Sequence, residues 1–95
     1  MEDCKTMTPL EKLEYLHDRL SGMNKKERGE LSVLKVTRRG EYSVSLNCVL
    51  QDIDLHIDAL LKGDFYTLRE IETEFLYHNY REYLNAAYKR VITNS

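Results

Sequence analysis

The architecture of this chain depends on residues 32–46, which read SVLKVTRRGEYSVSL. The β-branched residues of the run 32–37 favour a strand, and the run 42–46 could pair with it across an Arg-Arg-Gly-Glu turn. The region therefore fits a β-hairpin over residues 32–46.

A helix over residues 24–40 competes with this hairpin. Asn24 and Glu27 have the spacing of a capping box, and Arg38-Arg39-Gly40 is typical of a basic last turn followed by a terminal glycine. Gly29 and the β-leaning run weaken this interpretation. We prefer the helix and keep the hairpin as the alternative.

The segment before this region predicts a helix over residues 9–21. Thr8 is a good N-cap, Pro9 suits the first helical position, and Glu11 completes a capping box. Gly22 ends the helix. Its apolar stripe recurs at spacings of three and four residues, at Leu10, Leu13, Leu16 and Leu20.

The segment after the region predicts two more helices. A run of about seventeen residues from Ser45 has a 3.6-residue apolar period, which is too long for a typical strand. The run closes at Lys62-Gly63-Asp64. The last helix, over residues 66–92, lacks Gly and Pro and is long enough either to break near His78-Asn79 or to project beyond the core.

These segments predict one domain over residues 1–95, with residues 1–7 disordered. We expect an all-α, compact bundle of about four helices with a long C-terminal helix. The alternative is an α+β fold in which the hairpin replaces the second helix. A core of this size supplies little stability, so a homo-oligomer formed through the last helix is a plausible addition.

Composition indicates an ordinary globular protein, with 42% hydrophobic and 32% charged residues. Cys4 and Cys48 lie far apart and outside any C-x-x-C pair, which favours reduced thiols. The first residues are charged and contain no apolar segment of the kind found in signal peptides. No apolar run is long enough to span a bilayer. We expect a cytoplasmic protein without membrane contact.

The sequence offers little for catalysis or metal binding. Asp52 and His56 form the one close pair of metal-ligand type, and a zinc site needs three or four ligands. Cys48 lies among apolar residues, where a thiol is usually a small packing residue. No nucleotide-binding or nucleophile motif is present. We therefore expect no metal, no cofactor and no enzymatic activity.

Tyrosine is concentrated in the last helical segment, with five of the seven tyrosines after residue 65. Tyrosine is common where protein surfaces meet, and a small bundle should not bury all five. The segment 52–74 beside it carries seven acids against two bases. We predict a partner-binding surface with anchors at Tyr77, Tyr80, Tyr83 and Tyr88 and a charged rim at Asp52, Asp54, Asp58, Glu70 and Glu74. The alternative is that two or three tyrosines serve the core.

A basic segment over residues 25–39 supports a second hypothesis. It has six cations against two acids and could neutralise several phosphates. The candidate nucleic-acid-binding residues are Lys25, Lys26, Arg28, Lys35, Arg38 and Arg39. The sequence pI of about 5.9 and the absence of aromatic residues between the cations argue against nucleic acid as the main partner.

Taken together, these features predict a small protein-binding regulator or inhibitor, with a nucleic-acid-binding regulator as the alternative. An acidic surface could occlude a partner's basic site. Small proteins of this build are often regulators, including those carried by phages and other mobile elements. That last expectation rests on how common such proteins are and not on particular residues.

Overall fold

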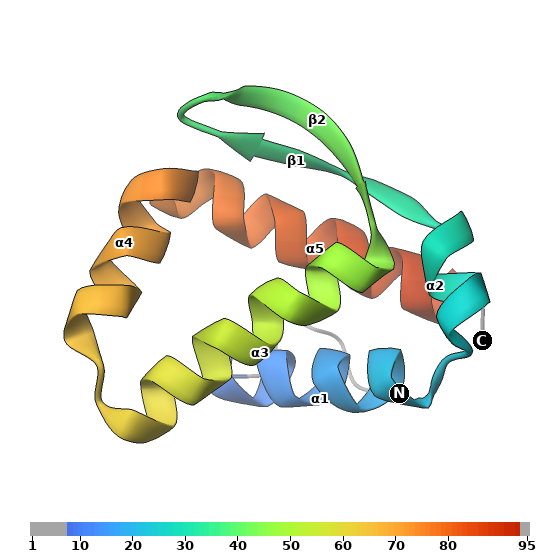
Figure 1. Ribbon diagram of the computed structural model, residues 1–95, viewed down its shortest axis with the longest axis horizontal. Helices are drawn as coiled ribbons and strands as arrows, with labels where there is room; N and C mark the ends of the chain where they lie inside the picture. Colours follow the sequence, from blue (N-terminus) through green and yellow to red (C-terminus); the bar gives the residue numbers. More distant parts are fainter. Residues whose placement is uncertain (1–7, 94–95) are drawn as a thin grey trace.

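The structure is a computed structural model that describes residues 8–93, without the side chains of Pro9, Tyr77 and His78. The disorder predicted for residues 1–7 falls outside this range. Figure 1 shows a mostly helical molecule with one small hairpin. The elements in chain order are α1 (Pro9–Gly22), α2 (Lys25–Glu30), β1 (Ser32–Thr37), β2 (Gly40–Ser45), α3 (Leu46–Lys62), α4 (Phe65–Phe75) and α5 (Tyr77–Thr93).

The predicted helix-dominated fold is confirmed, and helix α1 begins where its cap predicts. The Thr8 hydroxyl accepts a hydrogen bond from the Glu11 backbone N–H, and the Glu11 carboxylate accepts one from the Thr8 N–H. These reciprocal bonds satisfy two backbone donors that the first turn leaves without helical partners.

The preferred helix over residues 24–40 is wrong beyond residue 30, and the hairpin alternative describes this region. Strands β1 and β2 pair antiparallel, with Val33 opposite Val44 and Thr37 opposite Gly40. Val33 and Thr37 are buried whereas Leu34 is exposed, so the strands present one face to the helices. Packing of β-branched residues against α5 outweighs the helix-terminus signals at Arg38-Arg39-Gly40.

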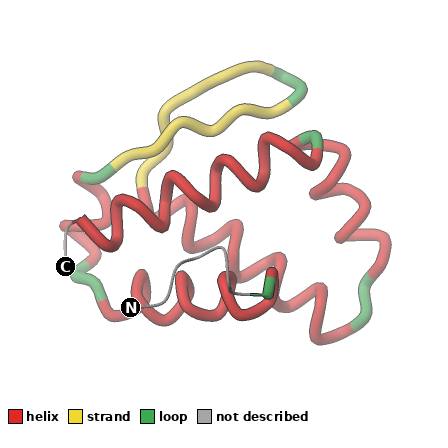
Figure 2. The backbone as a smooth tube through the Cα atoms, turned by 180° about the vertical axis from the view of Figure 1, so that it is seen from behind, coloured by secondary structure: helices red, strands yellow, loops and turns green. Residues whose placement is uncertain are grey.

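The hairpin lies along one edge of the helical part, over α5 and the start of α3 (Figures 1 and 2). Backbone hydrogen bonds tie both of its ends. The Arg38 N–H donates to the Glu74 carbonyl at the tip, over 2.8 Å, and the Leu46 N–H donates to the Leu31 carbonyl at the base, over 3.0 Å.

One hydrophobic core joins these elements. Helices α1 and α3 face each other, and α5 lies between them and the hairpin. The buried apolar side chains that form this connected core are Leu13, Leu16 and Leu20 from α1, Val33 from β1, Leu46, Val49 and Ile53 from α3, Phe75 from α4, and Tyr83, Leu84, Ala87, Tyr88 and Val91 from α5. Among the described residues, no helix combines the length and apolar character needed to cross a membrane.

The predicted long C-terminal helix is two helices, and the break falls at Leu76, slightly before the predicted position. Leu76 has φ 59° and ψ 115°, which leucine rarely adopts because its Cβ is crowded. Its carbonyl accepts from the Asn79 N–H over 2.7 Å and so begins α5. The turn lets Phe75 enter the core while α4 crosses the end of the helical layer (Figure 1).

We expect Leu76→Gly to raise the free energy of unfolding by about 1 kcal/mol. The positive φ costs a leucine about 1–3 kcal/mol, and the extra freedom of glycine in the unfolded chain offsets about 0.5–1 kcal/mol of the gain. Leu76→Ala is the matched control, because it removes the same exposed side chain but keeps the strained Cβ. Urea unfolding followed by circular dichroism measures both variants. A glycine variant no more stable than the alanine variant would contradict this account of the break.

Candidate functional site

Two of the four predicted tyrosine anchors are core residues. Tyr83 is 1% exposed and Tyr88 is 8% exposed, so neither can present its ring to a partner in this structure. Tyr80 is partly buried and packs against the core. The side chain of Tyr77 lies outside the described residues. The five tyrosines are not all buried, since Tyr66 is 74% exposed, but Tyr83 and Tyr88 follow the alternative that some of them serve the core.

The buried tyrosines are accommodated by ring packing and by one carboxylate. Tyr83 stacks on Phe75 with ring centroids 5.2 Å apart, and Phe75 meets Tyr80 edge-on at 4.8 Å. The Tyr83 hydroxyl donates to Asp52 Oδ2 over 2.7 Å. Burial and then the bond to Asp52 raise the pKa of Tyr83, so its hydroxyl remains a donor.

Asp52 is partly buried, and its carboxylate is engaged by two partners within the fold. The same Oδ2 atom accepts from Lys35 Nζ over 3.0 Å, and that ammonium lies 5.2 Å from the centre of the Phe75 ring. Asp52 thus links β1 to α3 and α5 through Lys35 and Tyr83. Asp52, a predicted rim residue, and Lys35, a predicted nucleic-acid contact, therefore neutralise each other within the fold.

The other four predicted rim acids are placed differently from one another. Asp54 pairs with His17 Nε2 at 2.6 Å, and Asp58 pairs with Lys62 at 3.1 Å, one helical turn away. Glu74 lies under the hairpin tip, within 3.6 Å of Arg38 and 3.7 Å of Arg39. Glu70 is exposed on α4. Asp54, Asp58 and Glu70 are all exposed, so they remain accessible to a partner.

The structure exposes an apolar cluster where α3 turns into α4. Leu61 is 74% exposed, Phe65 79% and Tyr66 74%, and we call these three residues the α3–α4 corner. Gly63, with φ 67°, ends α3 in the left-handed conformation, and the Asp64 carboxylate caps α4 by accepting from the Thr67 N–H. Only two residues therefore separate the end of α3 from Phe65, so the three exposed side chains lie close together along the chain. Figure 1 shows this corner at the lower left.

Sequence analysis missed this corner as a site. None of Leu61, Phe65 and Tyr66 was named as a binding residue. The sequence feature that could have indicated the corner is the position of Phe65 and Tyr66. Both precede the apolar stripe of the final segment, at a helix start where a core residue is not required. Leu55 adds a further exposed apolar side chain on α3, at 52%.

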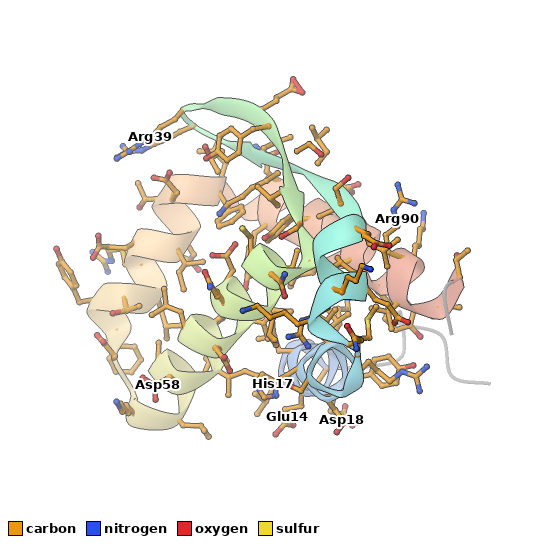
Figure 3. The ribbon with its side chains drawn as sticks, turned by 45° about the vertical axis from the view of Figure 1, so that its right-hand side comes forward. Glu14, His17, Asp18, Arg39, Asp58 and Arg90 are labelled. Atoms are coloured by element: carbon orange, nitrogen blue, oxygen red, sulfur yellow. The ribbon has the colours of Figure 1, made fainter. Side chains whose placement is uncertain are left out.

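Both acids and bases flank the corner, since Lys62 follows Leu61 directly and pairs with Asp58. Asp58 lies one turn before Leu61 on α3, and Glu70 lies one turn after Tyr66 on α4, so each shares a helix face with an apolar member. Figure 3 places Asp58 at the α3 end of this region. Exposed aromatic and aliphatic side chains with charges beside them are typical of protein-binding surfaces.

The predicted basic segment does not form one surface. Lys25 and Lys26 are exposed on α2, whereas Arg38 and Arg39 lie at the hairpin tip, at the opposite end of the molecule (Figures 1 and 3). Arg28 is partly buried, and its guanidinium donates to the carbonyls of Leu20 and Met23 and to the Asn47 side chain. Sequence proximity therefore does not produce a continuous track for phosphates.

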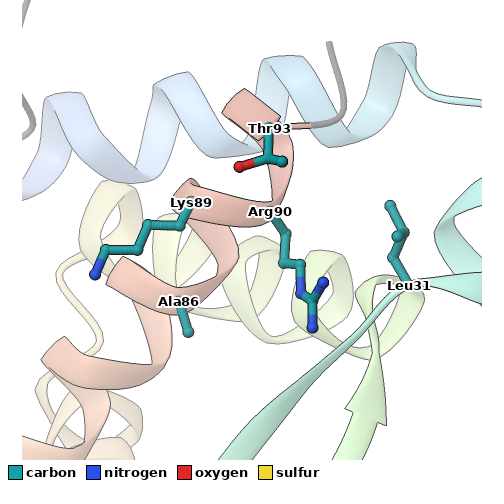
Figure 4. A pocket seen from close by; sticks show the side chains of 5 residues that line it. All are labelled: Leu31, Ala86, Lys89, Arg90 and Thr93. Atoms are coloured by element: carbon teal, nitrogen blue, oxygen red, sulfur yellow. The ribbon is translucent and has the colours of Figure 1, made fainter.

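A shallow pocket beside the end of α5 carries two further cations. Figure 4 shows it lined by Leu31, Ala86, Lys89, Arg90 and Thr93. Lys89 and Arg90 leave α5 in different directions, so their charges do not converge on one point (Figure 4). We assign no site there.

The described residues contain no group of three His, Cys, Asp or Glu side chains placed to hold a metal ion. Cys48 is exposed and free, on the first turns of α3. No family model matches this chain, and no curated protein or solved structure is significantly similar to it.

Proposed function

We propose that this chain is a small protein-binding regulator or inhibitor that acts through the α3–α4 corner and the acids beside it. The observation that carries the proposal is the exposure of Leu61 at the end of α3 and of Phe65 and Tyr66 at the start of α4, each about three-quarters exposed. A small domain gains stability by burying such side chains, so their joint exposure needs a reason outside the fold. Contact with another protein supplies one.

The proposed partner is basic around an apolar pocket. The segment 52–74 carries a net charge of −5, from seven acids and two bases, and four of its acids (Asp54, Asp58, Asp64 and Glu70) flank the corner or lie one or two turns from it. Phenylalanine and tyrosine at the centre of an interface supply most of the binding energy, and the charges around them supply orientation and speed. Such a surface would occlude a basic site on its partner, which is how a regulator without a catalytic centre can act.

We expect charge reversal beside the corner to weaken binding of a basic partner by about tenfold or more at low salt. Asp58→Lys with Glu70→Lys changes the net charge by +4. The matched control is Glu27→Lys with Glu30→Lys, which makes the same change on α2, at the other end of the molecule. A fluorescent helical peptide patterned with lysine and leucine serves as the probe, and its Kd is measured by anisotropy from 50 to 500 mM salt, a range that shortens the screening length to about 4 Å.

The control variant separates a local surface from overall charge. If both double variants lose affinity equally, the peptide responds to net charge and the corner is not the site. If neither loses affinity, the acids beside the corner play no part in binding. The proposal requires that only the corner variant loses affinity for the peptide, and that its remaining affinity depends less on salt.

A further inference from the structure

A separate apolar pocket opens between α1 and α4. Its volume is about 320 Å³, at the lower end of the range for small-molecule sites. Helix α4, which the structure describes in full, buries Phe75 alone, so its apolar residues Leu68 and Ile71 are only partly covered. The apolar lining of the pocket comes from four helices, through Leu13, Leu60, Leu68, Ile71 and Leu84.

One polar pair lies in this apolar lining. His56 Nδ1 is within hydrogen-bond distance of the Tyr80 hydroxyl, and both residues line the pocket. Burial lowers the pKa of His56 and raises the pKa of Tyr80, so both are neutral near pH 7. If Tyr80 donates, the Nε2–H of His56 and a lone pair of the Tyr80 oxygen remain. If His56 donates, the Tyr80 O–H and the Nε2 lone pair remain. In either tautomer the pair therefore keeps one donor and one acceptor.

A hydroxyl group matches this pair best. It both donates and accepts, so it can bond to whichever atom the tautomer presents. A pure hydrocarbon in the same place would cover the remaining donor and acceptor without replacing their hydrogen bonds with water, which is costly.

The charged residues at the pocket do not select an ion. Lys12 and Glu72 both line it, and their opposite charges sum to zero. The third charged residue, Arg81, already has an interaction partner within the fold. The Lys12 ammonium donates to the Asn85 side chain over 3.2 Å. A charged ligand would lose its hydration without meeting an uncompensated opposite charge, so a neutral ligand is favoured.

We propose that the pocket between α1 and α4 binds a small neutral apolar molecule with one hydroxyl group, of the size of an alkylphenol. The aliphatic walls receive the hydrocarbon, and the His56–Tyr80 pair receives the hydroxyl. The volume of about 320 Å³ sets the size, because it holds about ten non-hydrogen atoms at about 30 Å³ each. The proposal does not depend on the α3–α4 corner.

The test is a titration with 4-propylphenol, followed by NMR of ¹³C-labelled leucine and isoleucine methyl groups. We expect saturable shifts at Leu68 and Ile71 in the pocket, without matching shifts at Leu61 in the corner. Three analogues with the same propylphenyl group separate the contributions of charge and hydroxyl. Propylbenzene, which lacks the hydroxyl, should bind about tenfold more weakly. The anion 4-propylbenzoate and the cation 4-propylbenzylamine should each bind at least about tenfold more weakly than the phenol.

A double variant tests the assignment of the hydroxyl to the polar pair. His56→Leu with Tyr80→Phe removes the polar atoms of the pair, so the phenol and propylbenzene should bind with affinities equal to within about twofold. The matched control is His17→Leu with Tyr42→Phe, which removes the same two kinds of polar group outside the pocket and should keep the tenfold preference.

Folding of both variants is checked by circular dichroism. The four ligands on the unaltered protein decide the question even if the pair variant does not fold. The proposal is overturned if no shift saturates, or if Leu61 shifts in parallel with Ile71. It is also overturned if either charged analogue or propylbenzene binds as tightly as the phenol, or if the folded pair variant keeps the preference for the phenol.

Discussion

Tyr83→Ala should lower the free energy of unfolding by about 3–5 kcal/mol, the range for removing a large buried ring. Tyr83 is 1% exposed, stacks on Phe75 and donates its hydroxyl to Asp52. The substitution therefore leaves a cavity and removes a hydrogen bond from a carboxylate that Lys35 alone would then neutralise. The free energy of unfolding of a domain of this size is about 5–15 kcal/mol, so much of its stability would be lost.

Two further substitutions divide this effect into its parts. Tyr83→Phe keeps the ring and should cost about 1–2 kcal/mol through the missing hydroxyl. Tyr66→Ala removes an exposed tyrosine and should change stability by no more than about 0.5 kcal/mol. Because the chain has no tryptophan, urea unfolding is followed by far-ultraviolet circular dichroism. If Tyr83→Ala were as stable as the parent and lost only partner binding, Tyr83 would be the surface anchor that its sequence position first indicates.

Phe65→Ala should have the opposite profile, with an unchanged fold and a partner affinity reduced about thirtyfold or more. A central aromatic anchor typically contributes about 2 kcal/mol or more to binding, and Phe65 is the most exposed member of the corner. Truncation of Phe65 should change the free energy of unfolding by no more than about 0.5 kcal/mol, because little of the ring contacts the core. Isothermal calorimetry or anisotropy with the partner captured at this surface gives the affinity.

Leu34→Ala is the matched control for Phe65→Ala. Leu34 is also more than half exposed, but it lies on the outer face of β1, away from the corner. Equal losses in the two variants would show that exposed apolar area in general, and not the α3–α4 corner, drives the association. A Phe65 variant that binds as tightly as the parent would remove the corner from the interface.

Local signals predicted the parts of this fold that local chemistry controls. The capping box at Thr8 and Glu11 places the start of α1, and the 3.6-residue period over residues 46–62 predicts α3. The hairpin was harder, because the helix-terminus signals at Asn24 and Gly40 compete with the β-branched residues at 33–37. Contact with α5 resolves that competition, and a tertiary contact of this kind leaves no trace in the local pattern.

The break at Leu76 has the same origin. Nothing in the residue types around Leu76 stops a helix, since neither Gly nor Pro is present. The chain turns there because Phe75 is buried against Tyr80 and Tyr83. The burial of Phe75 offsets the cost of the unfavourable φ at Leu76.

The candidate site was predicted less well than the fold. The acidic character of residues 52–74 is visible in the sequence, and Asp54, Asp58 and Glu70 do remain exposed. The number of tyrosines did not indicate which of them the core would use. That depended on Asp52, which accepts a hydrogen bond from the buried Tyr83 hydroxyl, and no spacing rule pairs residues so far apart in the chain. The exposed cluster instead arises from a short turn between two helices.

The most direct test of the α3–α4 corner as an interaction surface is site-specific photo-crosslinking in the cells that naturally produce this protein. Benzoylphenylalanine replaces Phe65 in one variant and Leu34 in the other, and crosslinked species are resolved by gel and identified by mass spectrometry. We predict a discrete protein adduct from position 65 that is absent from position 34 and is lost when Asp58 and Glu70 are reversed to lysine. No adduct from position 65, or the same adducts from both positions, would contradict the proposed function.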